Sequence, residues 1–199
     1  MTAIILLENG NLEETVVVDK KAASIGGSRL GLTIGDKITL NDLLYGLMLC
    51  SGNDAAVQIA ISIAGDTEKF SDMMNEKAYK LGLKDTHFVT SHGLDNDGHY
   101  TTAYELAKIS DYALEIEKFS EVVSSRTYTV TINGYPRTIT NTNELLGNVT
   151  GVNGIKTGFT AKARKVLSNV CGETRIKGYY SSFRFRYKKD KRKRLGYAY

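Results

Sequence analysis

A mixed α+β fold, with helices packed against an antiparallel sheet, is the fold class that this sequence predicts. Apolar residues recur at helical spacing through the middle of the chain, between about residues 40 and 113. Strand-like segments lie on both sides of this region, and two of them surround Asn133-Gly134, a dipeptide typical of tight hairpin turns. Apolar residues make up 42% of the 199 residues, which is enough for the buried core of one medium-sized domain.

The first two predicted helices meet at a short polar joint. Leucines and a methionine recur over residues 40–48 after Thr39, a possible N-cap, and the pattern stops at Cys50-Ser51-Gly52. A second helix is expected from about Asn53 to Gly65, because apolar residues recur there and Asp54 suits the positive end of a helix dipole. Ser51 is therefore expected between two apolar helices.

Two further helices and several strands complete the predicted elements. We expect Thr67 to cap a helix that stops at Gly82, and Thr102 with Glu105 to form a capping box ahead of another helix. Strands are expected at residues 16–18, at 128–132 and 137–140 around the hairpin turn, and at 155–159. Pro136 indicates that the second strand of the hairpin begins irregularly or lies at a sheet edge.

The net charge of +4 is divided unevenly along the chain. Residues 161–199 contain 13 Lys and Arg against 2 acidic residues, whereas residues 1–160 contain 13 basic and 20 acidic residues. A uniformly basic nucleic-acid-binding protein would not show this division, so we do not expect nucleic acid as a partner of the body of the chain. The sequence predicts a boundary near residue 160, followed by a divergent basic tail that a frameshift or a degraded terminus would explain.

Two tripeptides carry the functional signal. Ser51-Gly52-Asn53 lies at the predicted helix joint, and Lys156-Thr157-Gly158 lies on a predicted strand about a hundred residues later. Either one alone is most often an ordinary turn or strand, but chance occurrence of both in these positions is much less common. Together they resemble the second and third motifs of the penicillin-recognising serine enzymes. The first motif of those enzymes, Ser-x-x-Lys, is absent, because no serine of this chain has a lysine three places on.

Longer segments carry the same resemblance across about four fifths of the chain. The segment from residue 1 to about 160 resembles the D-alanyl-D-alanine carboxypeptidases among the low-molecular-mass penicillin-binding proteins. The similar strings lie at residues 20–28, 42–48, 51–56, 86–88, 92–94, 100–102 and 151–158. The resemblance implies a β-lactamase/transpeptidase-like fold with a helical subdomain and a peptidase S11-like catalytic domain over residues 1–160. We expect this domain to lack its N-terminal part, and the sheet to be incomplete at both chain ends.

The resemblance also implies a reaction and its residues. The family's serine attacks the peptide bond between two D-alanines of a peptidoglycan stem peptide, and water then releases the shortened peptide from the acyl-enzyme. Ser51, Asn53 and Lys156 are expected to be catalytic, and Thr157, Gly158 and Phe159 to bind substrate, with the Phe159 N–H as an oxyanion donor. Stem peptides ending in D-Ala-D-Ala and β-lactams are the expected partners. No cofactor and no metal is expected.

The absent Ser-x-x-Lys motif limits the expected activity. In the family it stands immediately before a string like Met1-Thr2-Ala3-Ile4, so we expect a gene fragment or a misassigned start, and an inactive isolated chain. The parent protein is expected to act outside the cytoplasmic membrane, although this chain shows no export signal and no membrane anchor.

Other interpretations of the sequence remain open. The chain could be a non-catalytic protein that binds peptidoglycan or β-lactams, or its basic tail could bind nucleic acid or another anionic surface. His87, His92 and His99, near Asp95 and Asp97, match no zinc pattern in their spacing, so loop histidines without a metal role are favoured. Cys50 and Cys171 are read as buried small residues rather than as a disulfide.

Overall fold

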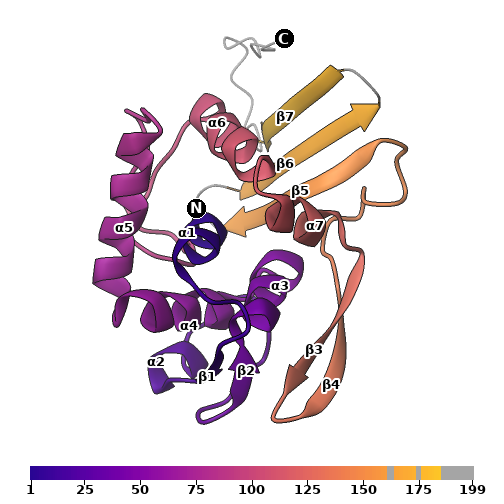
Figure 1. The fold of residues 1–199 in the computed structure, drawn as a ribbon. Coiled ribbons are helices and arrows are strands. Elements are labelled where there is room, and N and C mark those ends of the chain that lie inside the picture. Colours follow the sequence, from indigo (N-terminus) through magenta and orange to yellow (C-terminus); the bar gives the residue numbers. More distant parts are fainter. Residues whose placement is uncertain (161–163, 174–175, 185–199) are drawn as a thin grey trace.

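The computed structural model describes residues 1–160, 164–173 and 176–184, and the side chains of residues 1–158 (Figure 1). Its helices are α1 (Thr2–Asn9), α2 (Lys20–Ala23), α3 (Leu40–Cys50), α4 (Asn53–Ala64), α5 (Thr67–Lys80), α6 (Ala103–Leu114) and α7 (Glu117–Ser124). Its strands are β1 (Thr15–Val17), β2 (Lys37–Thr39), β3 (Thr127–Ile132), β4 (Tyr135–Thr140), β5 (Val152–Thr160), β6 (Arg164–Glu173) and β7 (Ile176–Arg184). The α+β prediction is confirmed.

The strands pair more locally than the sequence predicts. Within the described ranges they form three small antiparallel sheets, in the orders β1-β2, β3-β4 and β5-β6-β7, rather than one sheet. In Figure 1 the β5-β6-β7 sheet lies beside α6 and α7, and the β3-β4 hairpin extends away from it past α3. Sequence pattern identifies strands but not which strands pair, because pairing depends on contacts between distant segments.

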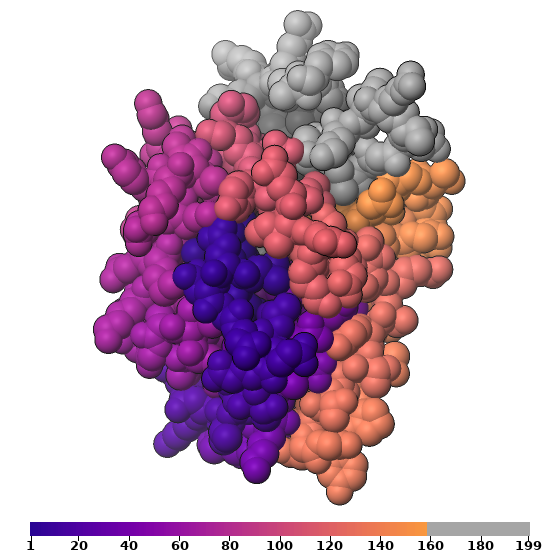
Figure 2. Space-filling view, in the orientation of Figure 1, coloured from indigo at the N-terminus to yellow at the C-terminus, as the bar shows by residue number. Residues whose placement is uncertain are grey.

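The helical half contains the core. Leu43, Leu44 and Leu49 of α3 and Ile59 of α4 are fully buried and belong to one apolar cluster. Helix α1, which the sequence analysis missed, contributes Ile4, Ile5 and Leu6 to the same cluster. On the face shown in Figure 2 the N-terminal segment, in indigo, lies between the magenta helices and the orange hairpin. The joint between α3 and α4 is therefore held by tightly packed helices.

Helix ends follow the predicted caps with two differences. Thr39 caps α3 by accepting a hydrogen bond from the N–H of Asp42 (3.0 Å), as predicted. Helix α5 begins at Thr67, but its cap is Asp66, whose carboxylate accepts from the N–H of Lys69 (2.8 Å). A carboxylate is the stronger acceptor at the positive end of a helix, so the cap lies one residue earlier than predicted.

The second difference concerns the predicted capping box. Thr102 caps α6 by accepting from the N–H of Glu105 (3.1 Å). The Glu105 carboxylate, however, accepts from the N–H groups of Lys84 (2.7 Å) and Asp85 (3.0 Å) instead of returning to the cap. Glu105 thus ties α6 to the segment that follows α5, and only half of the box forms.

The β3-β4 hairpin turns where predicted. Asn133 (φ 54°) and Gly134 (φ 82°) both have positive φ, as the tight turn requires. Asn133 also accepts from the N–H of Lys37 (2.8 Å) and donates to the Asp36 carboxylate (2.7 Å), so the tip of the hairpin is fixed to the loop before β2. The second strand begins at Tyr135, and Pro136 pairs with Thr131 in the ladder.

Two strands, β6 and β7, lie beyond the predicted boundary at residue 160. Strand β6 pairs with β5 in antiparallel register, with a bulge between Val152 and Ile155, and β7 pairs with β6 in continuous antiparallel register. The division of the chain into residues 1–160 and 161–199 stays a prediction, and the strongly basic stretch from residue 185 onward lies outside the described residues. None of the helices in the described ranges is both long and apolar enough to cross a membrane.

Candidate active site

Ser51 lies at the predicted joint in an uncommon backbone conformation. It is the C-cap residue of α3, with φ 56° and ψ 38°, and Gly52 is the N-cap residue of α4. Few residues other than glycine adopt this left-handed conformation, and such residues gather at functional sites. The sharp reversal between the two helices directs the Ser51 hydroxyl toward β5, where it meets Lys156.

Lys156 on β5 joins the two motifs. Its Nζ donates a hydrogen bond to the Ser51 hydroxyl and a second one to its neighbour's carbonyl, Thr157 O (3.0 Å). Burial lowers the pKa of Lys156 to about 8, because a charged ammonium is poorly solvated there. A lysine with this pKa can serve as a cation and also exchange a proton near neutral pH. The structure therefore brings together Ser51 and Lys156, two of the three residues expected to be catalytic.

Asn53, the last residue of the Ser51-Gly52-Asn53 tripeptide, holds a loop. Its side-chain amide donates to the carbonyl of Gly26 (2.8 Å), and its backbone N–H donates to the carbonyl of Ser28 (2.9 Å). A Cβ on Gly27, which has φ 84°, would lie 2.5 Å from the Asn53 side-chain nitrogen. In the part of the chain that the structure describes, the Asn53 side-chain oxygen has no hydrogen-bond partner, so it remains available as an acceptor.

Asp54 also holds the loop that precedes β2, a role that the sequence analysis did not assign. Its fully buried carboxylate accepts from the N–H groups of Leu30 (2.8 Å), Gly31 (2.8 Å) and Leu32 (3.0 Å). The Nε of Arg29 lies 3.6 Å from the same group. A buried carboxylate needs such partners. Asp54 therefore holds residues 29–32 against the start of α4, next to Asn53.

The predicted substrate-binding residues follow Lys156 along β5. Thr157 pairs with Leu167, Gly158 with Val166 and Phe159 with Lys165 in the ladder to β6. Among the described strands β5 pairs with β6 alone, and it also contacts helix α7 and, through Lys156, Ser51. The side chain of Phe159 lies outside the described residues; its predicted role concerns only its backbone N–H.

Thr142 belongs to this site and was missed by the sequence analysis. Its hydroxyl lies 2.8 Å from the Thr157 hydroxyl, and its backbone N–H donates to the carbonyl of Leu49 (3.0 Å) in the last turn of α3. Thr142 therefore contacts both β5, which carries the Lys156-Thr157-Gly158 tripeptide, and α3, which ends at the Ser51 cap. The only sequence signal was the string Asn141-Thr142-Asn143 shortly before β5, which reads as an ordinary turn.

Cys50 lies directly before Ser51 and is a half-buried free thiol. Burial raises the pKa of Cys50, and the nearby positive charges of Arg137 and Lys156 oppose this rise. The thiol therefore stays mostly protonated near neutral pH, which makes it a weak nucleophile. The side chain of Cys171 lies outside the described residues.

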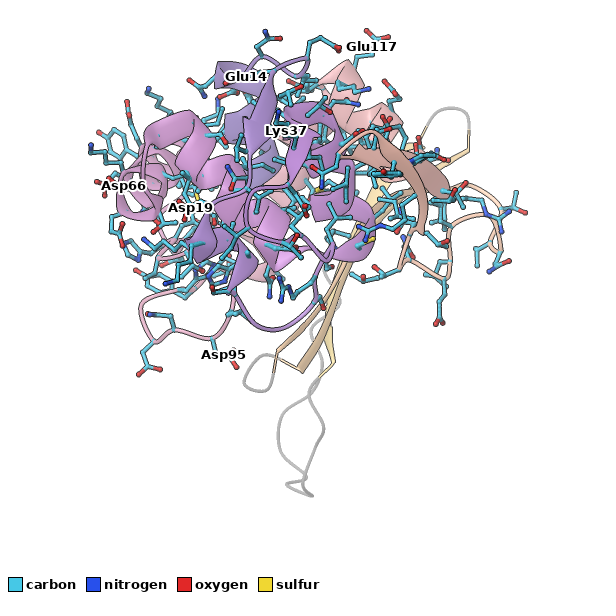
Figure 3. The ribbon with its side chains drawn as sticks, turned by 90° about the horizontal axis from the view of Figure 1, so that it is seen from below. Glu14, Asp19, Lys37, Asp66, Asp95 and Glu117 are labelled. Atoms are coloured by element: carbon cyan, nitrogen blue, oxygen red, sulfur yellow. The ribbon has the colours of Figure 1, made fainter. Side chains whose placement is uncertain are left out.

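The three histidines lie in the loop between α5 and α6. Each ring is engaged locally: His87 Nδ1 lies 2.6 Å from the Gly98 carbonyl, while His92 and His99 accept from the N–H groups of Leu94 (3.2 Å) and Val89 (3.3 Å). Figure 3 shows Asp95 of this loop at the edge of the molecule, pointing outward. Among the described residues, no group of three His, Cys, Asp or Glu side chains is arranged to hold a metal ion.

Comparison with known proteins decides the family. The sequence profile of the peptidase S11 family, described as D-alanyl-D-alanine carboxypeptidase, matches residues 1–177. The chain belongs to the D-alanyl-D-alanine carboxypeptidase family. The match extends past residue 160, into the segment that the sequence analysis set apart as a tail.

Individual members of the S11 family show the same relationship. The D-alanyl-D-alanine carboxypeptidase DacF of Bacillus subtilis is 36% identical over 180 residues, which cover 84% of this chain and 45% of DacF. DacD of Escherichia coli is 42% identical over 156 residues, which cover 76% of this chain and 39% of DacD. This chain thus spans less than half the length of these two S11 relatives.

Solved structures confirm the predicted β-lactamase/transpeptidase-like fold. The Streptomyces K15 DD-transpeptidase matches with a TM-score of 0.83 at 32% sequence identity, over 92% of this chain and 77% of the transpeptidase. A penicillin-binding protein homologue from Mycobacterium tuberculosis, Rv2911, matches with a TM-score of 0.83 at 31% identity, over 90% of this chain and 70% of that protein. The S11 assignment therefore rests on sequence and fold together.

Proposed function

We propose that this chain carries the substrate-binding and proton-transfer half of a serine-type D-Ala-D-Ala carboxypeptidase. The observation that carries the proposal is the hydrogen bond from Lys156 to Ser51, which joins the two motifs across a helix joint and a strand. The substrate is a peptidoglycan stem peptide that ends in D-Ala-D-Ala, and β-lactams bind at the same place. The family assignment and the carboxypeptidase names of the relatives support this proposal.

Lys156 and Thr157 recognise the terminal carboxylate of the peptide. With a pKa of about 8, Lys156 is mostly an ammonium at pH 7, and its charge attracts the carboxylate. The hydroxyl of Thr157, held by Thr142, adds a hydrogen bond to the same group. Gly158 lacks a Cβ, so the peptide backbone can approach β5 closely.

Ser51 and Asn53 act nearer to the scissile bond. The Ser51 hydroxyl both accepts and donates a proton, and it is already in contact with Lys156, so it can pass a proton toward the departing D-alanine amine. The side-chain oxygen of Asn53, which has no partner among the described residues, accepts from a peptide N–H of the substrate. The backbone N–H of Phe159 donates to the oxyanion.

The nucleophile and general base of this mechanism come from a Ser-x-x-Lys motif, which is absent from these 199 residues. We propose that the chain is a fragment whose isolated form binds D-Ala-D-Ala peptides without cleaving them. Because the binding groups are present and the nucleophile motif is absent, a non-catalytic peptidoglycan-binding role is the second candidate function. The peptidoglycan substrate places the parent protein in the cell envelope.

One pair of measurements tests the proposal. Isothermal titration of the chain with an acylated tripeptide ending in D-Ala-D-Ala should give reversible binding, and the same peptide with a terminal amide should bind much more weakly. The Lys156→Gln variant should bind both peptides equally weakly. Equal affinity of the unaltered chain for acid and amide would refute the assigned carboxylate site.

The second measurement addresses catalysis. Incubation with fluorescent penicillin, followed by denaturing electrophoresis, should leave this chain unlabelled under conditions that label the Bacillus subtilis relative. A labelled band from this chain would show that one of its own residues is an acylated nucleophile, and would contradict the fragment proposal.

A further inference from the structure

Three asparagines of this chain are followed directly by glycine: Asn9, Asn133 and Asn153. The side chain of an asparagine can be attacked by the backbone nitrogen of the next residue, and glycine hinders this attack least because it has no Cβ. All three asparagines are exposed to solvent. The dipeptide and its exposure are thus the same at the three positions, so we looked for a difference in how the fold holds each side chain.

Asn9 is held by the last turn of α1, of which it is the final residue. Its side-chain amide donates a hydrogen bond to the carbonyl of Ile5 (2.8 Å). The backbone N–H of Gly10, the attacking group, donates to the carbonyl of Leu6 (2.8 Å). Both reacting groups are therefore engaged, and an attack on Asn9 requires the end of the helix to open.

Asn133 is held at the tip of the β3-β4 hairpin. Its side-chain oxygen accepts from the N–H of Lys37 (2.8 Å), and its side-chain nitrogen donates to the Asp36 carboxylate (2.7 Å). Both polar atoms of this carboxamide are fixed to the loop before β2. An attack by the Gly134 nitrogen requires the hairpin tip to separate from that loop.

Asn153, near the start of β5, has no such restraint. Within the described residues its side chain makes no hydrogen bond and no ion pair. The ladder to β6 pairs Val152 and then Ile155, with a bulge between them, so Asn153 and Gly154 lie outside the regular register. The Asn153 carboxamide can therefore turn toward the Gly154 nitrogen without first losing a side-chain hydrogen bond.

We propose that Asn153-Gly154 is a site of spontaneous deamidation. The Gly154 nitrogen forms a bond to Cγ of Asn153, and the side-chain nitrogen leaves as ammonia after taking up the proton of that backbone nitrogen. Water then opens the cyclic succinimide at either of its carbonyl groups and leaves aspartate or isoaspartate, each with a new negative charge. Water is the only co-reactant. This chemistry is independent of the proposed function.

The modified residue would lie on the same strand as Lys156, three positions before it. Isoaspartate routes the main chain through the former side-chain methylene, so it lengthens β5 between the bulge and Lys156. Because strand register depends on the spacing of residues along the backbone, we expect the isoaspartate form to disturb the contact between Lys156 and Ser51. The aspartate form adds a charge without changing the backbone.

Peptide mapping by mass spectrometry tests the site. The full chain is stored for several weeks in mildly alkaline buffer, both folded and in guanidinium chloride. In the folded chain we expect Asn153 to convert about tenfold faster than Asn9 and Asn133, because they react only after local opening. In denaturant the three should convert at similar rates. Equal rates in the folded chain, or a preference for Asn153 that persists in denaturant, would overturn the proposal.

A matched variant links the modification to the candidate active site. Asn153→Gln keeps a neutral amide on a longer side chain, which closes a ring much more slowly. Gly154→Ala is unsuitable, because an added Cβ would lie 2.9 Å from Val123. Storage should weaken binding of a D-Ala-D-Ala peptide to the unaltered chain about threefold to tenfold, as for a lost hydrogen bond, and should leave Asn153→Gln unchanged.

The binding measurement rests on the proposed function, whereas the mass measurement does not. An equal loss of affinity in the stored variant would refute the effect of Asn153 on the site. A freshly prepared chain that binds no peptide would refute the proposed function, and the mass spectra would still decide whether Asn153 is the modified residue.

Discussion

Lys156 donates a hydrogen bond to Ser51 across 105 positions of the sequence, from a strand to the joint of two helices. The contact brings the two motifs onto one site and surrounds the ammonium with protein. Burial is the reason why the pKa of Lys156 falls to about 8. The properties of this pair determine how the site responds to pH.

Affinity for a D-Ala-D-Ala carboxylate should decrease as the pH rises through about 8. Lys156 loses its proton in that range, and with it the charge that attracts the carboxylate. Titration calorimetry from pH 6.5 to 9.5 would measure this decrease. Lys156→Gln should bind weakly at every pH, so a pH dependence of the same size in that variant would assign the effect to another group.

The contribution of Lys156 to the stability of the fold should become more favourable over the same range. The pKa of Lys156 is lower in the folded chain than its ordinary value of 10.5, so between pH 8 and 10.5 the unfolded chain holds a proton that the folded chain has released. This group therefore opposes folding at neutral pH, and the opposition declines as the pH rises. Urea unfolding at pH 7.5 and 9.5 should show a smaller gain for Lys156→Gln than for the unaltered chain.

Thr142→Val should weaken peptide binding with little loss of stability. Removal of the hydroxyl leaves Thr157 without its side-chain partner, and we expect the dissociation constant to rise about threefold to tenfold, as for a lost hydrogen bond. Thr142→Ser should restore binding. The backbone N–H of Thr142 still reaches Leu49 in both variants, so thermal unfolding should be nearly unchanged. Unaltered affinity in Thr142→Val would exclude a role in positioning Thr157.

Asp54→Asn should strongly destabilise the fold. The buried carboxylate accepts from the N–H groups of Leu30, Gly31 and Leu32, and an amide replaces one acceptor oxygen by a donor that faces other donors. We expect a loss of about 2–4 kcal/mol in the free energy of unfolding. Urea denaturation would measure this loss, with exposed Glu76→Gln as the neutral control. A change below about 0.5 kcal/mol would contradict the assigned role.

Two adjacent glycines provide a matched test of the loop over Asn53. Gly27→Ala adds a Cβ at φ 84° and 2.5 Å from the Asn53 side-chain nitrogen, so it should displace Asn53 and reduce both stability and peptide affinity. Gly26→Ala adds a Cβ with nothing within 4 Å and should be nearly neutral. Thermal unfolding and calorimetry of the two variants would make the comparison, and equal behaviour would refute it.

The sequence predicted what depends on local pattern and on family motifs. The approximate bounds of α3 and α4 and the hairpin turn at Asn133-Gly134 are as expected. The residues of the two tripeptides could be assigned to one candidate site from the sequence because the family pattern is specific. Their catalytic roles stay predictions.

The sequence could not reveal partners that only tertiary structure brings together. Asp54 reads as a helix-start acid, and nothing local shows that its carboxylate binds residues 30–32, more than twenty positions earlier. Thr142 reads as a turn residue until β5 is placed beside it. Helix α1 was missed because its apolar residues form a continuous run, which does not distinguish a buried helix from a strand.

At Ser51, the left-handed backbone conformation favours glycine, whereas the contact with Lys156 requires a hydroxyl. Glycine adopts φ 56° without the Cβ clash that a serine incurs, a difference of roughly 1 kcal/mol in conformational energy. Glycine would therefore be the least strained residue at this position. Such an exchange would relieve the backbone strain and remove the hydroxyl that Lys156 contacts. The strained backbone at Ser51 is thus retained because the side-chain oxygen is needed at that point. Substitutions that stabilise this protein without loss of the site should therefore be made at other positions.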